Sequence, residues 1–90
     1  MKVYLFKHFN DALPYGEEEV RVFASKEAAE NALVHAVEAT TGWPYEKTGQ
    51  WLEENGYDPA EWNHDHQGYT AFPDPRGGYS FFEVEEHTVE

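Results

Sequence analysis

The sequence lacks cysteine, which excludes a disulfide framework, a thiolate metal site and a cysteine nucleophile. It also lacks long apolar runs, and no stretch approaches the roughly 20 residues that a membrane-spanning helix needs. At the N-terminus, the apolar residues 3–6 are too few to form a signal peptide. We therefore expect a soluble cytoplasmic protein with no membrane partner.

Basic residues are scarce as well. Six Lys and Arg stand against eighteen Asp and Glu, which gives a formal net charge of −12. This balance excludes direct nucleic-acid binding through phosphate neutralisation and argues against docking on anionic lipid. It instead favours attraction to basic surfaces, with association accelerated by electrostatic steering. The alternative is that the acids only keep a small protein soluble.

Large aliphatic residues are few, with four leucines and no isoleucine, whereas Phe, Trp and Tyr make up 17% of the chain. Each buried ring removes about 150–250 Å² from water, so a few rings can offset the entropy of ordering a short chain. We predict a single acidic domain over residues 1–90 with an aromatic core.

The clearest structural pattern lies in residues 20–42. Residues 20–24 are typical of a short strand, and Ser25 is the predicted N-cap of a helix. Apolar residues then recur with the period of one buried helical face. This stripe consists of Ala29, Ala32, Leu33, Ala36, Val37 and Thr40. Gly42, followed by Pro44, predicts the end of the helix.

A second helix is predicted over residues 44–55, closed by Gly56. Its apolar positions are Tyr45, Thr48, Trp51 and Leu52. Gly49 costs about 1 kcal/mol relative to alanine in a helix interior, and we expect it to permit close packing against the first helix. Residues 58–61 combine an Asp cap with a proline and predict a further short helix. Residues 63–68 are interpreted as a loop.

The remaining segments predict strands. Residues 3–9 begin with apolar side chains on both faces, which is typical of a central strand. Residues 20–24 would pair with it in antiparallel fashion, and residues 69–72 and 79–89 would form the last two strands. The resulting order, ββααββ, predicts an α+β fold in which two helices pack on one face of an antiparallel sheet of about four strands.

The first 40 residues also carry a resemblance. Val3-Tyr4-Leu5 is followed by His8, and residues 22–32 read VFASKEAAENA. In these features the chain resembles the start of many small uncharacterised phage and bacterial proteins. Those proteins share a short strand, a second strand that ends in a motif similar to residues 22–32, and a helix. The resemblance implies the start of a fold and a mobile-element origin. It assigns no functional residues, and residues 43–78 depart from it in length and content.

No catalytic motif is present. The sequence has no nucleophile motif, no Gly-rich phosphate loop and no Ser/His/Asp pattern in a recognisable context. Pairs of neighbouring carboxylates are unavoidable among eighteen acids, so they do not indicate acid–base catalysis. We predict that the protein is not an enzyme and uses no cofactor.

His64 and His66 are the candidate metal ligands. Alternate residues of an extended segment point the same way, so both imidazoles could meet one ion. Asp65, or the distant His8 or His87, could complete such a site. The alternative is a pair of surface histidines in a polar loop, and we predict no metal because no second ligand pair has a recognisable spacing.

Aromatic residues are dense in the second half of the chain. Within 20 residues lie Trp43, Tyr45, Trp51, Tyr57 and Trp62. We predict that Trp51 belongs to the core. Tyr57, Trp62 and Tyr69 are the candidate residues of an aromatic surface, through which a structural or regulatory module would bind a partner.

Several acids occupy positions that helix stability does not favour. Glu38, Glu53 and Glu54 lie near the C-terminal ends of the predicted helices, where negative charge opposes the helix dipole by about 0.3–1 kcal/mol each. Acids on one helical face lie about 5–6 Å apart, a spacing similar to that of phosphates along a nucleic-acid strand. The candidate partner-binding acids are Glu17, Glu18, Glu19, Glu27, Glu30, Glu38, Glu53 and Glu54.

Together these features predict a non-enzymatic acidic protein that binds a basic protein surface. The more specific hypothesis is a phage or mobile-element inhibitor that occupies a nucleic-acid-binding surface of a host enzyme by charge mimicry. Anti-CRISPR proteins, whose partners are CRISPR effectors, are the analogous class by size and charge. The aromatic module and the histidine metal site are the alternatives.

Overall fold

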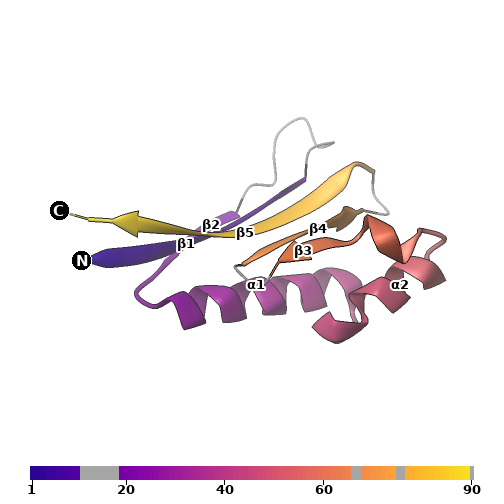
Figure 1. Ribbon diagram of the computed structural model, residues 1–90, viewed down its shortest axis with the longest axis horizontal. Coiled ribbons are helices and arrows are strands. Elements are labelled where there is room, and N and C mark those ends of the chain that lie inside the picture. Colours follow the sequence, from indigo (N-terminus) through magenta and orange to yellow (C-terminus); the bar gives the residue numbers. More distant parts are fainter. Residues whose placement is uncertain (11–18, 66–67, 75–76, 90) are drawn as a thin grey trace.

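The computed structural model describes residues 1–10, 19–65, 68–74 and 77–89 of the 90-residue chain (Figure 1). Five strands form one antiparallel sheet in the order β2-β1-β5-β4-β3. In chain order the elements are β1 (Lys2–Asn10), β2 (Glu19–Phe23), α1 (Lys26–Thr41), the 3₁₀ turn η1 (Tyr45–Lys47), α2 (Thr48–Glu54), the 3₁₀ turn η2 (Pro59–Glu61), β3 (Asn63–Asp65), β4 (Tyr69–Pro73) and β5 (Tyr79–Thr88).

The predicted α+β architecture is confirmed in its main features. Both α-helices lie on the same side of an antiparallel sheet (Figure 1). The expectation of about four strands is wrong, because β3 adds a fifth strand in a segment that was interpreted as a loop. This strand has only three residues, and pairing of Asn63 with Ala71 and of Asp65 with Tyr69 defines it. A segment this short has too few positions to show a strand periodicity.

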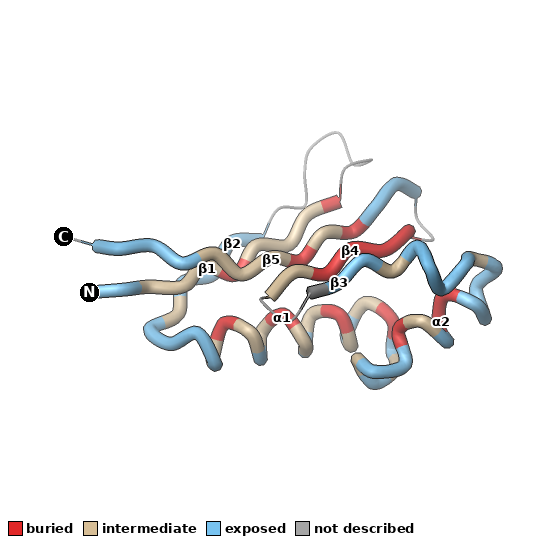
Figure 2. Tube along the Cα trace, in the orientation of Figure 1, coloured by how far each residue is buried: buried red, intermediate tan, exposed pale blue. Residues whose placement is uncertain are grey.

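Aromatic rings form the centre of the core, as predicted. Phe6, Phe72 and Phe82 come from β1, β4 and β5, and each is at most 1% exposed. Phe72 stacks on Phe82 with ring centroids 5.5 Å apart, and Trp51 of α2 meets Phe72 edge-on at 5.6 Å. Figure 2 shows buried positions recurring along α1 and filling most of β4, where helix layer and sheet meet.

Helix α1 begins and ends as the sequence predicts. The Ser25 hydroxyl accepts a hydrogen bond from the Ala28 amide at 3.2 Å, and Gly42 ends the helix in the left-handed region at φ 74°. The fully buried line consists of Ala29, Leu33, Val37 and Thr41. Thr40, which was expected on that line, is only half-buried, so Thr41 closes the inner face instead.

The predicted second helix is divided. Tyr45–Lys47 forms η1, and the α-helix proper is limited to Thr48–Glu54. Its predicted apolar side is confirmed, since Thr48, Trp51 and Leu52 are buried. The expected packing of Gly49 against α1 is wrong: the atoms nearest to a Cβ built there belong to Trp62 and Pro59, at 3.6 and 3.7 Å. Helix α2 therefore packs closely against the segment that follows it.

The other face of the sheet is not covered by any element in the described part of the chain. Leu5 pairs with Val22 on this face, and Phe9 stacks on Phe81 at 4.9 Å between ring centroids. Val22 lies on the edge strand β2 and is 64% exposed. Apolar side chains therefore lie on both faces of the sheet, and helices cover only one of them.

Candidate functional site

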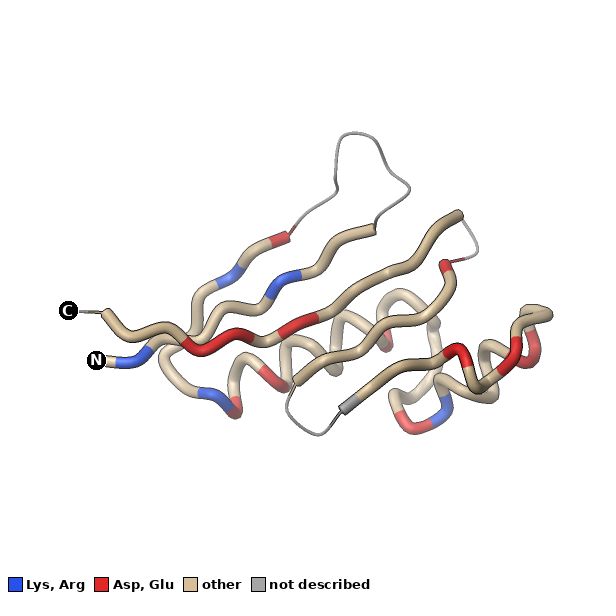
Figure 3. Tube along the Cα trace, turned by 45° about the horizontal axis from the view of Figure 1, so that its top comes forward, with Lys and Arg blue, Asp and Glu red and all other residues tan. Residues whose placement is uncertain are grey.

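The structure distributes the candidate acids over three elements. Glu19 lies on the edge strand β2. Helix α1 contains Glu27, Glu30 and Glu38, and the last two residues of α2 are Glu53 and Glu54 (Figure 3). Glu17 and Glu18 lie outside the described residues. The described members of the set do not form a single continuous row, so they do not share one role.

Three of these acids have partners within the fold. Glu19 lies 3.9 Å from the Arg21 guanidinium, and Glu30 lies 3.7 Å from the Lys26 ammonium one helical turn away. Glu38 accepts a hydrogen bond from the Tyr45 amide at 3.0 Å. The expectation that stability gives no reason for Glu38 is therefore wrong, because its carboxylate caps the first amide of η1.

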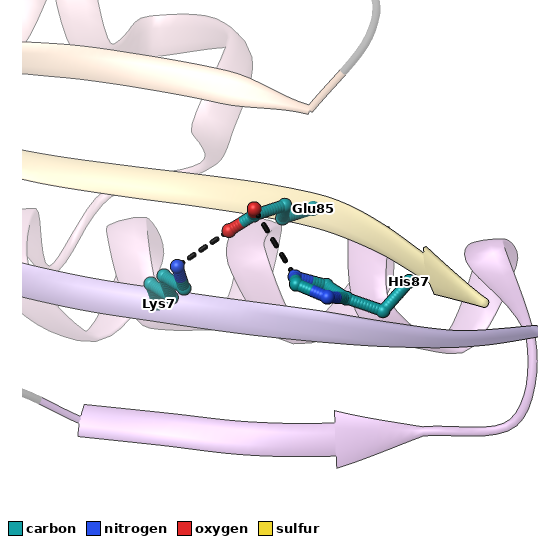
Figure 4. A network of polar contacts seen from close by, with 3 residues as sticks. All are labelled: Lys7, Glu85 and His87. Atoms are coloured by element: carbon teal, nitrogen blue, oxygen red, sulfur yellow. Dashed lines mark hydrogen bonds and ion pairs between the residues drawn. The ribbon is translucent and has the colours of Figure 1, made fainter. Parts of the chain in front are cut away.

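Two acids of β5, Glu85 and Glu86, are matched to bases of the neighbouring strand β1. Lys7 of β1 donates a hydrogen bond to Glu85, and His87 Nε2 lies 3.1 Å from the other oxygen of the same carboxylate (Figure 4). The hydrogen bond from Lys7, aided by the charges of Lys7 and His87 and opposed by desolvation, lowers the pKa of Glu85 below its ordinary value. Glu86 lies 3.7 Å from Lys2. These carboxylates join β1 to β5.

The acids without an ion-pair partner among the described residues are concentrated around α2. Residues 45–61 contain five acids and a single base, Lys47. We call this segment, η1 through η2, the acidic corner. Its acids are Glu46, Glu53, Glu54, Asp58 and Glu61, all exposed. Within the described part of the chain none of the five forms an ion pair, although Asp58 accepts a hydrogen bond from the Ala60 amide as a helix cap.

From the sequence, only Glu53 and Glu54 of this corner were predicted to bind a partner. Glu46, Asp58 and Glu61 were missed because the prediction weighed acids by their place in single helices, and these three lie in or beside the short 3₁₀ turns. A count of charge over a short window would have found them. Figure 3 shows the contrast: apart from Lys47, the described bases lie on β1, on β2 and at the start of α1.

The candidate aromatic residues do not form one surface. Trp62 is half-buried on the helix side, and its ring meets Tyr45 edge-on at 5.8 Å. Tyr57 packs against the edge of the core. Tyr69 pairs with Glu83 on the opposite face of the sheet from the buried Phe72, which alternates with it along β4. The structure therefore separates Tyr69 from Trp62.

The two candidate metal ligands are not brought together by any described contact. His64 stacks on Trp62 with ring centroids 4.1 Å apart, and His66 lies outside the described residues. His8, a proposed distant ligand, stacks on Phe82 at 4.2 Å. Among the described residues, no group of three or more His, Asp and Glu side chains is placed to hold a metal ion.

A pocket of about 350 Å³ adjoins the acidic corner. It lies between α1, η1 and the segment that contains β3. Its lining residues are Glu30, Leu33, Val34, Tyr45, Glu46, Trp62, His64 and Gly68. The pocket thus unites one candidate acid, Glu30, with the candidate aromatic residue Trp62 and the candidate metal ligand His64.

The indole N–H of Trp62 is buried and donates to no acceptor within the described part of the chain. Leaving such a donor unpaired costs about 1–3 kcal/mol. The ring is nevertheless stacked on His64 and in edge-on contact with Tyr45, so aromatic packing determines its position.

Comparison of the chain with protein-family models, with curated proteins and with solved structures finds no match. In the residues that the structure describes, no helix is both long enough and apolar enough to cross a membrane. The candidate sites are the acidic corner and the adjoining pocket.

Proposed function

We propose that this protein is a non-enzymatic interaction domain that binds a basic surface of a partner protein through its acidic corner. The observation that carries the proposal is the concentration of five exposed acids in residues 45–61, where Lys47 is the only base. Glu85 and Glu86 of β5 have ion-pair partners, as do the candidate acids Glu19 and Glu30. Among the described residues, acids without a base are therefore most concentrated in the corner.

Stability accounts for only part of this concentration, since Asp58 caps η2 but Glu53 and Glu54 have no such role. Like charges on neighbouring turns repel one another, and Glu53 and Glu54 at the end of α2 oppose its dipole by about 0.3–1 kcal/mol each. A basic partner would relieve this repulsion, so the free energy that the cluster costs in folding is recovered on binding. The same field raises the association rate with such a partner.

The more specific form of the proposal is an inhibitor that occupies a nucleic-acid-binding surface. The exposed carboxylates of the corner, with one base among them, can meet the same Lys and Arg side chains that bind phosphates. Host nucleases and CRISPR effectors are the partner classes that fit a protein encoded by a phage or mobile element.

The test is direct binding to purified nucleic-acid-binding proteins, nucleases and CRISPR effectors included, at low and at moderate salt. The corner variant carries Glu53→Gln, Glu54→Gln and Glu61→Gln. We expect it to bind roughly tenfold more weakly at low salt, the sum of three exposed ion pairs. The unmodified protein should compete with nucleic acid and lose affinity as salt rises.

A matched control separates local charge from net charge. The variant Glu19→Gln, Glu83→Gln and Glu86→Gln removes the same charge from the sheet, away from the corner. We expect it to bind nearly as well as the unmodified protein. Equal losses in both variants, or binding that is insensitive to salt, would contradict a role for the corner.

A further inference from the structure

The pocket beside the acidic corner is an open depression lined by both buried and exposed residues. Leu33 of α1 is 3% exposed and belongs to the core, whereas Glu46 and His64 are exposed. Its volume of about 350 Å³ lies at the lower end of the range for ligand pockets, about 300–1,000 Å³. A single long side chain therefore suits it better than a large ligand.

Aromatic rings give this pocket a preference for positive charge. The Trp62 ring stacks on His64 and meets Tyr45 edge-on, so three rings from two segments surround the space. The face of an indole attracts a cation within about 6 Å, with an energy of about 0.5–1 kcal/mol at exposed sites.

Two carboxylates among the lining residues strengthen that preference. Glu46 has no ion pair within the described residues, and Glu30 shares its charge only with Lys26, at 3.7 Å on an exposed surface. An anion would be repelled here, and a neutral apolar group would make no use of the carboxylates. An organic cation uses both the rings and the acids.

We propose that the pocket receives the side chain of an arginine on the basic partner, with its guanidinium against Trp62 and the carboxylates of Glu30 and Glu46. This inference rests on the proposed function, since the partner supplies the arginine. Arginine fits better than lysine because its planar, weakly hydrated guanidinium stacks on aromatic faces and pairs with carboxylates in a bidentate manner.

Glu46 connects the pocket to the proposed interface. It is a member of the acidic corner and also lines the pocket. A partner whose basic surface covers Glu53 and Glu54 therefore brings its next arginine within reach of the pocket. Arginine is enriched in interfaces and at their energetic hot spots, so one inserted side chain would fix the orientation of the complex.

The test uses small probes and needs no identified partner. Isotope-labelled protein is titrated with acetyl-arginine methylamide, with its lysine counterpart and with its neutral citrulline counterpart, and the indole N–H of Trp62 and the amides of Val34 and Gly68 are followed by NMR. We expect saturating shifts with the arginine probe, weaker ones with lysine and none with citrulline.

Two pairs of variants locate the binding. Glu46→Gln should weaken binding of the arginine probe roughly two- to fivefold, as expected for one exposed ion pair. Glu86→Gln removes the same charge from the sheet, outside both the lining and the corner, and should leave binding of the probe unchanged. Trp62→Phe should weaken binding of the arginine probe by a similar factor, because phenylalanine gives a smaller cation–π attraction, whereas Tyr57→Phe should not weaken it.

The proposal is overturned if citrulline shifts the same signals as arginine, or if the arginine shifts are absent or do not respond to Glu46→Gln. It is also overturned if the partner binds the Trp62→Phe and Glu46→Gln variants unchanged while the corner variant loses binding. That last result would leave the proposed function standing, which distinguishes failure of the pocket from failure of the corner.

Discussion

At the scale of single residues, the most constrained carboxylate is Asp74. It is only 3% exposed and accepts hydrogen bonds from Ser80 Oγ at 2.6 Å and from Asn10 Nδ2 at 3.1 Å. Asn10 ends β1 and Ser80 lies near the start of β5, so this one side chain joins strand ends that are far apart in sequence. Its role is structural.

Asp74→Ala should therefore lower the free energy of unfolding by about 2–3 kcal/mol, because Asn10 and Ser80 both lose an acceptor in a buried setting. Denaturant unfolding measures this value. Glu61→Ala, which removes an exposed acid with no ion pair among the described residues, is the control and should change stability by less than about 0.5 kcal/mol. Equal effects of the two substitutions would show that the Asp74 contacts are not formed in solution.

Two glycines with different surroundings give a second prediction at this scale. A Cβ at Gly49 meets Trp62 and Pro59 at ordinary contact distances of 3.6 and 3.7 Å, so Gly49→Ala should stabilise the protein by about 0.5–1 kcal/mol through helix propensity. Gly68 has φ +96°, and a Cβ there would lie 2.9 Å from Val84 Cβ.

Gly68→Ala should accordingly destabilise the protein by about 1–3 kcal/mol through backbone strain, and the close contact with Val84 adds to this cost. Thermal and denaturant unfolding of the two variants provide the comparison. A destabilising Gly49→Ala would mean that α2 packs more tightly on Trp62 than the described distances show.

At the scale of elements, the pairing of β1 with β5 carries two of the four Lys or Arg ion pairs among the described residues. Lys7, Glu85 and His87 form one network across these two strands (Figure 4). The pKa of Glu85 is lower in the folded protein than its ordinary value, chiefly because Lys7 donates a hydrogen bond to the carboxylate. The contribution to stability is therefore present above the ordinary pKa and is lost as the pH falls through the lowered value.

Glu85→Gln should make the acid side of the stability–pH curve less steep, because glutamine does not titrate. Denaturant unfolding at a series of pH values from neutral to acidic measures the slope. Glu83→Gln, a change two residues earlier on the same strand, serves as the control for a lost carboxylate. If Glu85→Gln leaves the slope unchanged, the ion pair with Lys7 does not persist in solution.

The elements also differ in how far their sequences determine them. Helix α1 was predicted with its N-cap Ser25 and its end at Gly42, because a helix of this length repeats its apolar positions several times. Strand β3 and the turn η1 were not predicted. Each has only three residues, and β3 is defined by hydrogen bonds to β4, a segment elsewhere in the chain.

At the scale of the whole molecule, the uncovered face of the sheet mixes apolar and charged side chains, since Val20 pairs with Lys7 and Leu5 pairs with Glu85. Helices cover one face of the sheet, β1 and β5 match their charges, and the acidic corner lies at the α2 end (Figure 3). The uncovered face of the sheet carries Val20 and Val22 on the edge strand, 50% and 64% exposed. Exposed apolar edge strands favour pairing with other chains, and the net charge of −12 opposes such association.

The sequence by itself determined the α+β class, the aromatic core and the excess of negative charge, because these depend on composition and on periodicity within single segments. Only the tertiary structure decided which acids are matched and which are left without a base. Glu38 turned out to cap η1, and Glu85 to pair with Lys7 of another strand. Likewise, packing alone brings Glu30, Glu46 and Trp62 around one pocket, because contacts between distant segments leave no periodic trace in the chain.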